Sequence, residues 1–479
     1  MRRAKYKFLA MASPLLLAAG CKLGPDYYRP REEVPEAYRF EANPTPGSFA
    51  DQGWWQIYQD PTLQALLTDA LAHNLDVRIA ATRVEQAAAA LGSTRLQQLP
   101  QAAVSFGAER QRTSQYTLLP GEPPINNVFT AQGSLSYEVD FWGKYRRASE
   151  AARAQLLSTE YGRDDVVASL IASVVADYFT LQSLDEQVAI TQRTIETRQK
   201  FVDLTEGQHE RGTVSGLDVA SAQAQLAVAQ ASLPDLERQI AQLEDQLSVL
   251  LGHNPAPILR NADGEFKRTA QESPPVPPAG LPSTLLERRP DVREAEQNLV
   301  AANAQVGVAK ANLFPTISLT AAGGSLSTEL SKLFTAPARA WSLGGSILQP
   351  LLDPQRSRYQ LDLADAQKRQ ALLQYEQRVR IAFQEVSDAL IARQKTAEVQ
   401  RALQTGVDAQ RKADTIALAR YRVGNASYFD VINADRDLFN AELTLSTAHL
   451  NTLLSLVQLY RALGGGWQSR PATDGEPNR

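Results

Sequence analysis

The 479-residue sequence predicts an α+β membrane protein with an internal structural repeat. The repeat itself is the first observation: Asp76-Val77-Arg78 opens an alanine-rich helical run that ends at Pro100, and Asp291-Val292-Arg293 opens a similar run that ends at Pro315. Second, the residues after each proline alternate between apolar and polar, which is the period of a strand. Third, two glycine- and proline-poor stretches of about 65 residues exceed the length of ordinary globular helices several times. Self-similarity on this scale indicates a duplicated unit.

The amino terminus, residues 1–20, has the features of a secretory signal peptide. Basic residues precede an apolar stretch from Phe8 to Ala19, which is too short to span a bilayer as a helix. Leu17-Ala18-Ala19-Gly20 then leads to Cys21, the one cysteine of the sequence, in a pattern that resembles a bacterial lipobox. We therefore expect a lipid on Cys21 that tethers the chain without spanning the membrane. The alternative is an ordinary signal peptide followed by an incidental cysteine.

The mature chain begins with a segment rich in prolines and aromatic residues. Residues 21–60 show no helical or strand period, and we expect a lipidated, extended arm. Asp60-Pro61 then starts a helix, with proline at a first-turn position where its missing N–H costs little, and helix is expected to continue to about Leu99. Repeat 1 occupies residues 61–252 and repeat 2 occupies residues 283–466.

Each repeat carries two predicted strands, each apolar on one side. They cover about residues 101–112 and 128–140 in repeat 1, and about 315–327 and 341–351 in repeat 2. A length of about 10 residues suits a tilted strand that crosses a bilayer. The apolar side is formed by alternate residues: Val104, Phe106, Ala108, Phe129, Ala131, Leu135, Tyr137, Val139, Ile317, Leu319, Ala321, Trp341, Leu343, Gly345 and Ile347.

A long helical run follows each strand pair and turns back on itself. In repeat 1 Gly212 stops the run and Ser215-x-x-Asp218 opens the next helix, and in repeat 2 Gly424 and Ser427-x-x-Asp430 do the same. Glycine adopts the left-handed conformation that ends a helix. Serine with an acid three residues later resembles a capping box. The sequence thus predicts two long αα-hairpins.

The returning helix of repeat 1 has a heptad seam that alternates steps of three and four, which is typical of coiled-coil packing. The seam residues are Leu226, Ala229, Leu233, Leu236, Ile240, Leu243, Leu247 and Leu250. Pro234 lies inside it and is expected to kink the helix. Residues 253–282 are predicted to be a proline-rich connector, and residues 467–479 a flexible tail.

Four strands that are apolar on one side cannot lie in a membrane alone, because lipid offers no hydrogen-bond partner to the two open edges. Closure between identical chains solves the problem, and three copies give twelve strands, a size found among outer-membrane barrels. The same closure gathers twelve long helical segments into a tube. The alternative is a soluble coiled-coil spacer with ordinary strands.

The sequence shows no sign of catalysis. Its net charge of −4 gives no polybasic patch for nucleic acid. The four histidines, His73, His209, His253 and His449, show no metal-ligand spacing, and Cys21 is assigned to lipid. We therefore expect no enzyme activity, no metal, and no cofactor other than the covalent lipid.

Several motifs resemble the TolC-like outer membrane efflux proteins, in the lipoprotein branch of NodT- and OprM-like outer membrane factors. The matching segments, in chain order, are Cys21 with Gly24-Pro25-Asp26-Tyr27, Trp54-Trp55, Asp60-Pro61-x-Leu63, Ala70-Leu71-x-x-Asn74, Leu281-Pro282-Ser283-x-Leu285-Leu286-x-Arg288-Arg289-Pro290-Asp291, Arg420-Tyr421-Arg422-Val423-Gly424 and Leu463-Gly464-Gly465-Gly466-Trp467. They span nearly the whole chain.

The resemblance implies a homotrimer with a 12-stranded transmembrane β-barrel that continues into a periplasmic α-helical barrel. It also implies a belt formed by the termini and connector. The implied function is that of an exit duct that passively conducts drugs or other toxic small molecules out of a Gram-negative cell. The implied partners are a periplasmic adaptor, an inner-membrane resistance–nodulation–division pump and outer membrane lipid. Lys22, where sorted inner-membrane lipoproteins have aspartate, favours the outer membrane.

Two groups of residues are candidates for function at the hairpin ends. A resting tube must be closed, and Asp414, Arg420, Tyr421 and Arg422 are the predicted periplasmic gate, because a ring of carboxylates or arginines controls ion passage. The tips, about 211–218 and 423–430, are predicted to contact the adaptor. Their central residues are Gly212, Thr213, Val214, Ser215, Gly424, Asn425, Ala426 and Ser427.

Two alternative functions remain at this stage. A type I protein secretion duct has the same architecture, although the lipid anchor and the closing Gly464-Gly465-Gly466-Trp467 resemble the efflux branch. A lipid-anchored periplasmic adaptor or structural coiled coil belongs to a different class and would lack four membrane-length strands.

Overall fold

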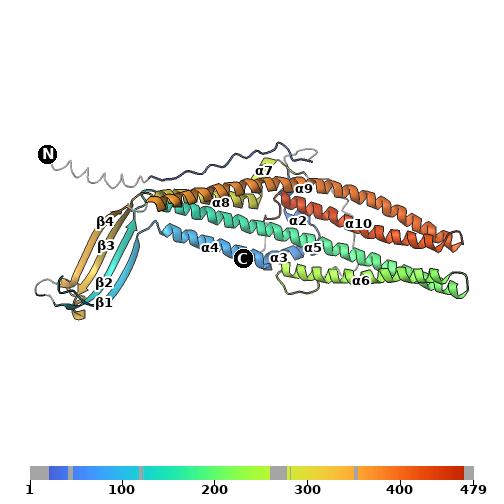
Figure 1. Cartoon of the computed structure of the whole chain (residues 1–479), viewed down its shortest axis with the longest axis horizontal. Coiled ribbons are helices and arrows are strands. Elements are labelled where there is room, and N and C mark those ends of the chain that lie inside the picture. Colours follow the sequence, from blue (N-terminus) through green and yellow to red (C-terminus); the bar gives the residue numbers. More distant parts are fainter. Residues whose placement is uncertain are drawn as a thin grey trace. The chain divides into compact units, whose positions relative to one another are not determined.

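The computed structural model describes residues 21–40, 47–117, 121, 123–258, 278–280, 282–349 and 354–468. The predicted signal peptide, most of the proline-rich connector and the last residues of the predicted tail lie outside these ranges. Within them the chain is mostly helical and carries one four-stranded sheet (Figure 1).

The first repeat follows two short helices, η1 (Phe49–Asp51) and α2 (Trp54–Ile57). Its elements are α3 (Pro61–His73), α4 (Leu75–Leu96), β1 (Gln101–Arg112), β2 (Ile125–Glu138), α5 (Lys144–Glu210) and α6 (Gly216–Leu250). The helix expected from Pro61 is thus divided at Asn74. The division has a local cause, since the Asn74 side chain accepts a hydrogen bond from the Val77 N–H at 3.0 Å and caps α4.

The second repeat has the same element order. Its elements are α7 (Pro282–Arg288), α8 (Pro290–Ala311), β3 (Thr316–Ser327), η2 (Leu330–Lys332), η3 (Ala336–Ala338), β4 (Arg339–Leu348), α9 (Pro354–Arg422) and α10 (Tyr428–Ala462). The division between α7 and α8 corresponds to the one at Asn74. Pro290 opens α8 at a position where proline fits the first turn.

The four strands form one antiparallel sheet in the order β1-β2-β3-β4 (Figure 1). The register pairs Phe106 with Ala131, Leu135 with Ala321, and Ala321 with Leu343. Directly paired residues of an antiparallel sheet share a face, so the alternate apolar residues of all four strands lie on one side. Serine, threonine, glutamine and glycine predominate on the other side.

The apolar face of this sheet is largely uncovered by the chain itself. On the two edge strands, Phe106 of β1 is 77% exposed, and Trp341 and Leu343 of β4 are 83% and 78% exposed. Water-exposed aromatic and aliphatic side chains in such a row mark a surface that another apolar phase or protein covers.

The described chain divides into two compact units that do not coincide with the two repeats. Unit 1 is Met1–Arg31, Arg83–Glu160 and Glu294–Glu376, and unit 2 is Glu32–Thr82, Tyr161–Arg293 and Gln377–Arg479. Each unit therefore combines segments of both repeats. This happens because α5 and α9 are long enough, at about 1.5 Å per residue, to contribute to both units.

The core of unit 2 joins the segment before repeat 1 to the helices. Trp54 and Tyr58 pack with Leu63 and Leu67 of α3, against α5 and α10. The core residues are Trp54, Tyr58, Leu63, Leu67, Ala70, Leu170, Ile171, Val174, Val175, Tyr178, Leu247, Leu251, Val457 and Tyr460. Helix α5 supplies part of this core. It is also the one helix among the described residues that is long and apolar enough to cross a membrane.

The motif before α8 closes unit 2 through a buried arginine. Arg289, whose side chain is 7% exposed, donates to Asp291 at 2.7 Å and to Glu385 of α9 at 2.6 Å. It also donates to the carbonyl of Ala462 at 2.9 Å. A buried guanidinium with carboxylate and carbonyl partners orders three chain segments at once.

The heptad seam of α6 faces inward. Every seam residue from Leu226 to Leu250 is buried or half-buried, whereas Val228 and Val249 beside it are exposed. Helix α6 continues through Pro234, which lies on the exposed side of the helix.

Candidate functional site

The two hairpin turns have the same backbone. Gly212 and Gly424 adopt φ of +73° and +77°, the left-handed region in which a side chain would be strained. The N–H of Gly212 donates to His209 O at 2.8 Å, and the N–H of Gly424 donates to Tyr421 O at 2.9 Å. In both turns a carbonyl left over at the helix end is satisfied by a left-handed glycine.

Both capping boxes form as the sequence suggests. The Ser215 hydroxyl accepts from the Asp218 N–H at 3.3 Å, and the Ser215 N–H donates to the Asp218 carboxylate at 3.0 Å. Ser427 and Asp430 make the same two bonds at the same two distances. The turns are therefore rigid local structures that need no distant partner.

The hairpin tips are exposed, and within the predicted ranges 211–218 and 423–430 they carry apolar side chains that were not among the named contact residues. Leu217 is 74% exposed, Val423 70% and Phe429 70%. Leu217 and Phe429 each follow the capping serine by two residues, so they occupy equivalent places. The sequence signal that could have indicated them is an apolar residue inside each capping-box motif, at Leu217 and Phe429.

The four predicted gate residues lie in different surroundings. Tyr421 donates to the Gln208 side chain at 3.0 Å, and its ring lies 5.7 Å from that of Phe201, so it joins α9 to α5. Arg420 donates to the carbonyl of Asn425 at 3.2 Å, within its own turn. Arg422 is exposed.

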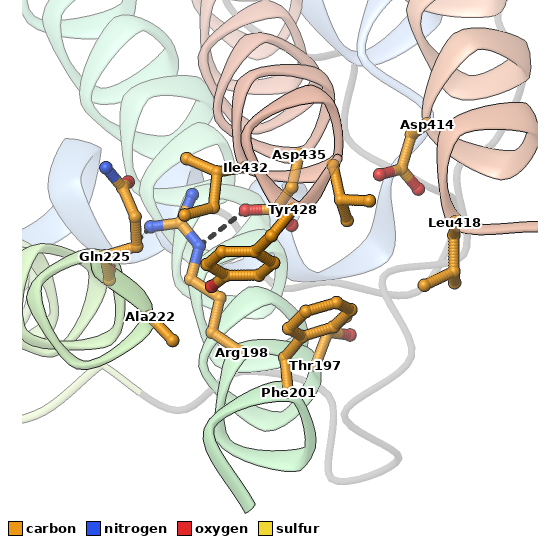
Figure 2. A pocket seen from close by; sticks show the side chains of 11 residues that line it. Thr197, Arg198, Phe201, Ala222, Gln225, Asp414, Leu418, Tyr428, Ile432 and Asp435 are labelled. Atoms are coloured by element: carbon orange, nitrogen blue, oxygen red, sulfur yellow. Dashed lines mark hydrogen bonds and ion pairs between the residues drawn. The ribbon is translucent and has the colours of Figure 1, made fainter. Parts of the chain in front are cut away.

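Asp414 lines a pocket between the helices behind the tips (Figure 2). On the opposite wall, Arg198 of α5 pairs with Asp435 of α10 at 2.7 Å, and only 5% of the Arg198 side chain is exposed. The guanidinium also donates to Gln225 O at 2.8 Å. Figure 2 shows the rings of Phe201 and Tyr428 beside this ion pair.

The charge of Asp414 is disfavoured in this pocket. Burial raises its pKa above the ordinary value, and the nearby carboxylates of Asp435 and Glu442 raise it further. The sequence suggested Asp414 as a gate residue but gave no sign of Arg198 and Asp435, which are 237 residues apart.

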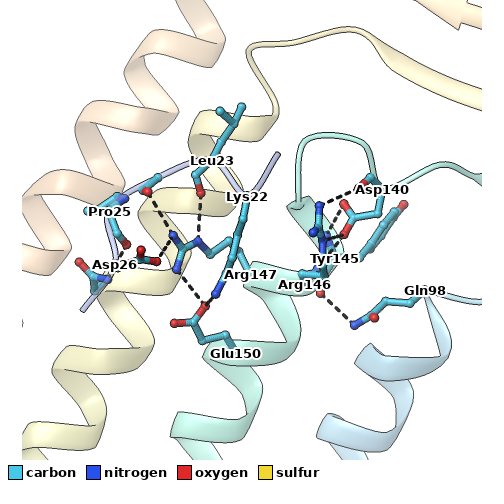
Figure 3. Close-up of polar contacts among 12 residues, drawn as sticks. Lys22, Leu23, Pro25, Asp26, Gln98, Asp140, Tyr145, Arg146, Arg147 and Glu150 are labelled. Carbon is cyan, nitrogen blue, oxygen red and sulfur yellow. Dashed lines mark hydrogen bonds and ion pairs between the residues drawn. The ribbon is translucent and has the colours of Figure 1, made fainter. Parts of the chain in front are cut away.

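The arm that begins at Cys21 is held by a fully buried arginine at the start of α5 (Figure 3). Arg147 donates to the carbonyls of Leu23 and Gly24 at 3.0 and 3.1 Å, and to the Asp26 carboxylate at 2.8 Å. It also pairs with Glu150 at 2.9 Å, and Glu150 accepts from Lys22 at 2.7 Å.

Two glycines let the arm lie directly on its helices. Gly24 has φ of +91°, and a Cβ built on it would lie 2.4 Å from the Cα of Gly307 in α8. A Cβ built on Gly143, at φ +77°, would lie 2.9 Å from the Cα of Lys22. The exposed Cys21, whose carbonyl accepts from Arg146 at 3.2 Å, is thereby fixed beside the start of α5.

Two of the four histidines lie together in the structure, although the sequence shows no metal-ligand spacing between them. His73 and His253, 180 residues apart in the sequence, both bond to the carboxylate of Asp69, each at 2.8 Å. Sequence spacing could not show this, because only the fold brings the turn after α6 to the end of α3. His209 instead bonds to Val214 O within its hairpin.

The chain matches the outer membrane efflux protein family over residues 66–253 and 281–465. It is 36% identical over 468 residues to the probable efflux pump outer membrane protein TtgC of Pseudomonas putida, covering 96% of this chain and 95% of that protein. It is 32% identical over 467 residues to the probable outer membrane lipoprotein SilC of Salmonella typhimurium, covering 97% and 99%.

A solved structure agrees over the same length. The open state of the MtrE outer membrane channel of Neisseria gonorrhoeae superposes with a TM-score of 0.82 at 30% identity, covering 95% of this chain and 100% of that one. The sequence, the sheet and the paired hairpins thus lead to one conclusion. The chain belongs to the outer membrane efflux protein family and is an NodT- and OprM-like outer membrane factor.

Proposed function

We propose that this outer membrane efflux protein forms a homotrimeric exit duct, through which drugs or other toxic small molecules leave a tripartite resistance–nodulation–division system. Passage is passive, and the inner-membrane pump supplies the energy. The family and the efflux proteins among its relatives support the exit-duct role. The proposal includes no catalytic step and no cofactor beyond a lipid.

The observation that carries the trimer is the sheet. Its register collects the apolar side chains on one face and leaves β1 and β4 as edges. An open edge facing lipid would leave backbone N–H and C=O groups unsatisfied, each at a cost of several kcal/mol. Pairing β1 of one subunit with β4 of the next removes both edges, and three subunits give twelve strands.

Disulfide trapping tests this ring. Ser105→Cys on β1 is combined in turn with Ser342→Cys, Gly344→Cys or Ser346→Cys on β4, all on the polar face. One pair should give a covalent trimer on oxidation, whereas each single variant should give none. A monomer by light scattering, with no cross-link from any pair, would overturn the ring.

Lipid on Cys21 would hold the start of the arm at the membrane surface. The support is geometric: Cys21 is exposed, and the buried Arg147 binds the carbonyls of Leu23 and Gly24, two and three residues after it. Mass spectrometry of the amino-terminal peptide should find a diacylglycerol-modified cysteine, absent in Cys21→Ser. A peptide in which Cys21 has a free thiol and is still linked to Gly20 would contradict the lipid anchor.

The hairpin tips are the proposed contact for a periplasmic adaptor. The glycine turns, with Leu217 and Phe429 projecting beside them, present apolar side chains on rigid capped ends. Leu217→Asp with Phe429→Asp should abolish adaptor pull-down from intact cells. Val249→Asp is the matched control, because Val249 is an exposed aliphatic residue of α6 away from the tip. Equal adaptor capture by all variants would exclude the tips.

The resting gate is proposed to depend on Asp414 and on the Tyr421–Gln208 contact, with Arg420 and Arg422 contributing charge at the tip. Tyr421→Phe removes one hydroxyl that joins α9 to α5. Together with Asp414→Ala it should raise the resting conductance in planar bilayers. Tyr359→Phe is a matched change on the same helix. An unchanged conductance would remove these residues from the gate.

Deletion of the gene separates the transport classes. Loss of the duct should increase sensitivity to toxic small molecules, and expression of the wild-type chain should restore resistance. Lost export of a secreted protein with unchanged drug sensitivity would instead favour the type I secretion duct. A chain that restores resistance without its strands would favour an adaptor.

A further inference from the structure

The end of α3 and the turn after α6 bring three metal-ligating side chains together. Asp69 and His73 are one helical turn apart, and His253 comes from the other segment. The donor atoms of the three side chains all lie within 4.8 Å of one another. None of these residues has a part in the proposed duct, the gate or the adaptor contact.

The present contacts show how closely the donors already converge. Nδ1 of His73 lies 2.8 Å from one carboxylate oxygen of Asp69, and Nε2 of His253 lies 2.8 Å from the other. The two imidazole rings are 5.5 Å apart. Tetrahedral Zn²⁺ binds nitrogen and oxygen at about 2.0–2.2 Å, so its donors are roughly 3.3 Å apart. Modest side-chain rotation brings these three to that spacing.

The backbone holds the two segments in place. The Asn74 side chain donates to Leu250 O at 2.9 Å. Gly252, at φ +80°, lies so close that a Cβ on it would come within 2.3 Å of the His73 carbonyl oxygen. These contacts hold the turn at Gly252 against the end of α3, so His253 reaches Asp69 without the cost of ordering a loop. His73 is also the last residue of α3, where the helix dipole favours a cation.

The second repeat provides an internal comparison. Gly464 has φ of +81°, and a Cβ on it would lie 3.1 Å from the Cγ of Arg289 and 3.2 Å from that of Arg288, which is a looser approach than that of Gly252. The turn after α10 therefore has the same left-handed glycine and also lies against the end of a short helix, α7. The residues that correspond to Asp69, His73 and His253 are Thr284, Arg288 and Gly465, which do not bind a cation. The glycine turn is therefore common to both repeats, whereas the three metal-ligating side chains occur only in repeat 1.

We propose that Asp69, His73 and His253 bind one divalent transition-metal ion per chain, with water completing the coordination. Two imidazoles and a carboxylate suit Zn²⁺, Cu²⁺ or Ni²⁺ rather than Ca²⁺ or Mg²⁺. The bound ion would tie the returning helix of the first hairpin to α3. The exposure of the site leaves it open to ions from solution.

Calorimetric titration of the full-length protein in detergent, first stripped with chelator, tests the site with ZnCl₂. One Zn²⁺ per chain is expected. His73→Ala and His253→Ala should each weaken binding about tenfold or more, since losing even a partner of a ligand costs about 10–100-fold. His209→Gln, a change at an exposed histidine away from the site, should bind as the wild type.

Hydrogen exchange distinguishes a clamp from loose surface binding. Zinc should slow exchange in residues 250–258 of the wild type and leave residues 462–466, the equivalent turn, unchanged. Asp69→Asn should lose this protection while keeping the helical content and assembly of the wild type. Binding of equal strength in the His73→Ala/His253→Ala double variant would show adventitious metal and overturn the proposal, as would no heat of binding in the wild type.

Discussion

The two hairpins have turns of the same backbone structure, but different residues lie behind those turns. Gly424 follows Gly212 by 212 residues (424 − 212 = 212), and the glycine and capping-box contacts agree bond for bond. Behind the turns the same offset places Asp414 where the first hairpin has the buried Val202, and Asp435 where it has Gln223.

The tyrosines and carboxylates of this pocket region are thus on the second hairpin, whereas Phe201 and Arg198 are on the first. Tyr421 and Tyr428 correspond to His209 and Gly216 of the first. The one buried cation of the cluster, Arg198, comes from the first hairpin and pairs with Asp435 of the second. The comparison teaches that local turn chemistry fixes the shape of an end, whereas the residues behind it decide whether that end can respond to charge.

Placing the second hairpin's carboxylate in the first would test this division most severely. Val202 is 4% exposed and packs against Ala222, Leu226 and Tyr428. Val202→Asp would bury a carboxylate among apolar side chains and should cost about 3 kcal/mol or more. Hydrogen exchange in residues 195–226 should accelerate roughly a hundredfold. Val228→Asp, on the exposed side of α6, should have little effect.

Removal of the cation that joins the hairpins should have the next largest effect. Arg198→Met leaves Asp435, 24% exposed, without its ion pair and frees the carbonyl of Gln225. The expected cost is about 2 kcal/mol, below the range for a fully buried pair because Asp435 still reaches water. Gln410→Met, which places methionine at the equivalent position of α9 without removing a charge, is the control. Equal exchange rates in α10 for both variants would show that the pair contributes nothing.

The pH response should belong to the second hairpin. The folded pKa of Asp414 is raised by burial and by Asp435 and Glu442, so its ionised form destabilises the folded end. The folded second hairpin should become more stable as pH falls from neutral through the raised pKa of Asp414 toward the ordinary aspartate pKa of 3.8. Asp414→Asn should remove this dependence, worth up to about 1 kcal/mol because solvent screens a half-buried group. Asp437→Asn, an exposed change on α10, should keep the pH slope of exchange.

The capping serines should give the smallest effects, and equal ones. Ser215→Ala and Ser427→Ala each remove a side-chain acceptor 3.3 Å from an N–H, at a cost of about 0.5 kcal/mol for an exposed helix. Exchange in the first turns of α6 and α10 should rise by the same factor of about two. Unequal factors would mean that the turns differ despite their common backbone.

What the sequence could predict follows the range of the interactions. Strand periodicity and capping are local, so β1 occupies residues 101–112 as expected, and β2 and β4 differ by only a few residues at their ends. The exit-duct function followed from motifs along the chain. The break at Asn74 was missed because a side-chain cap there replaces one helical bond without any glycine or proline to announce it.

The polar contacts that define the candidate sites could not be predicted in the same way. Arg198 with Asp435, and Arg147 with Asp26, join positions more than 100 residues apart. No period or spacing marks such pairs, since only the packing of helices against one another brings them together. Arg147 resembled any other charge at the start of a long helix.

Gly92 of α4 and Gly307 of α8 occupy equivalent positions in the duplicated helix, yet their surroundings differ. Nothing lies within 4 Å of a Cβ added to Gly92, whereas one added to Gly307 would collide with Arg147 and with the carbonyl oxygen of Leu23. Only one of the two helices is therefore shaped to receive the arm. A chain with a duplicated helix therefore offers the arm one binding position, and the two repeats are not interchangeable at this point.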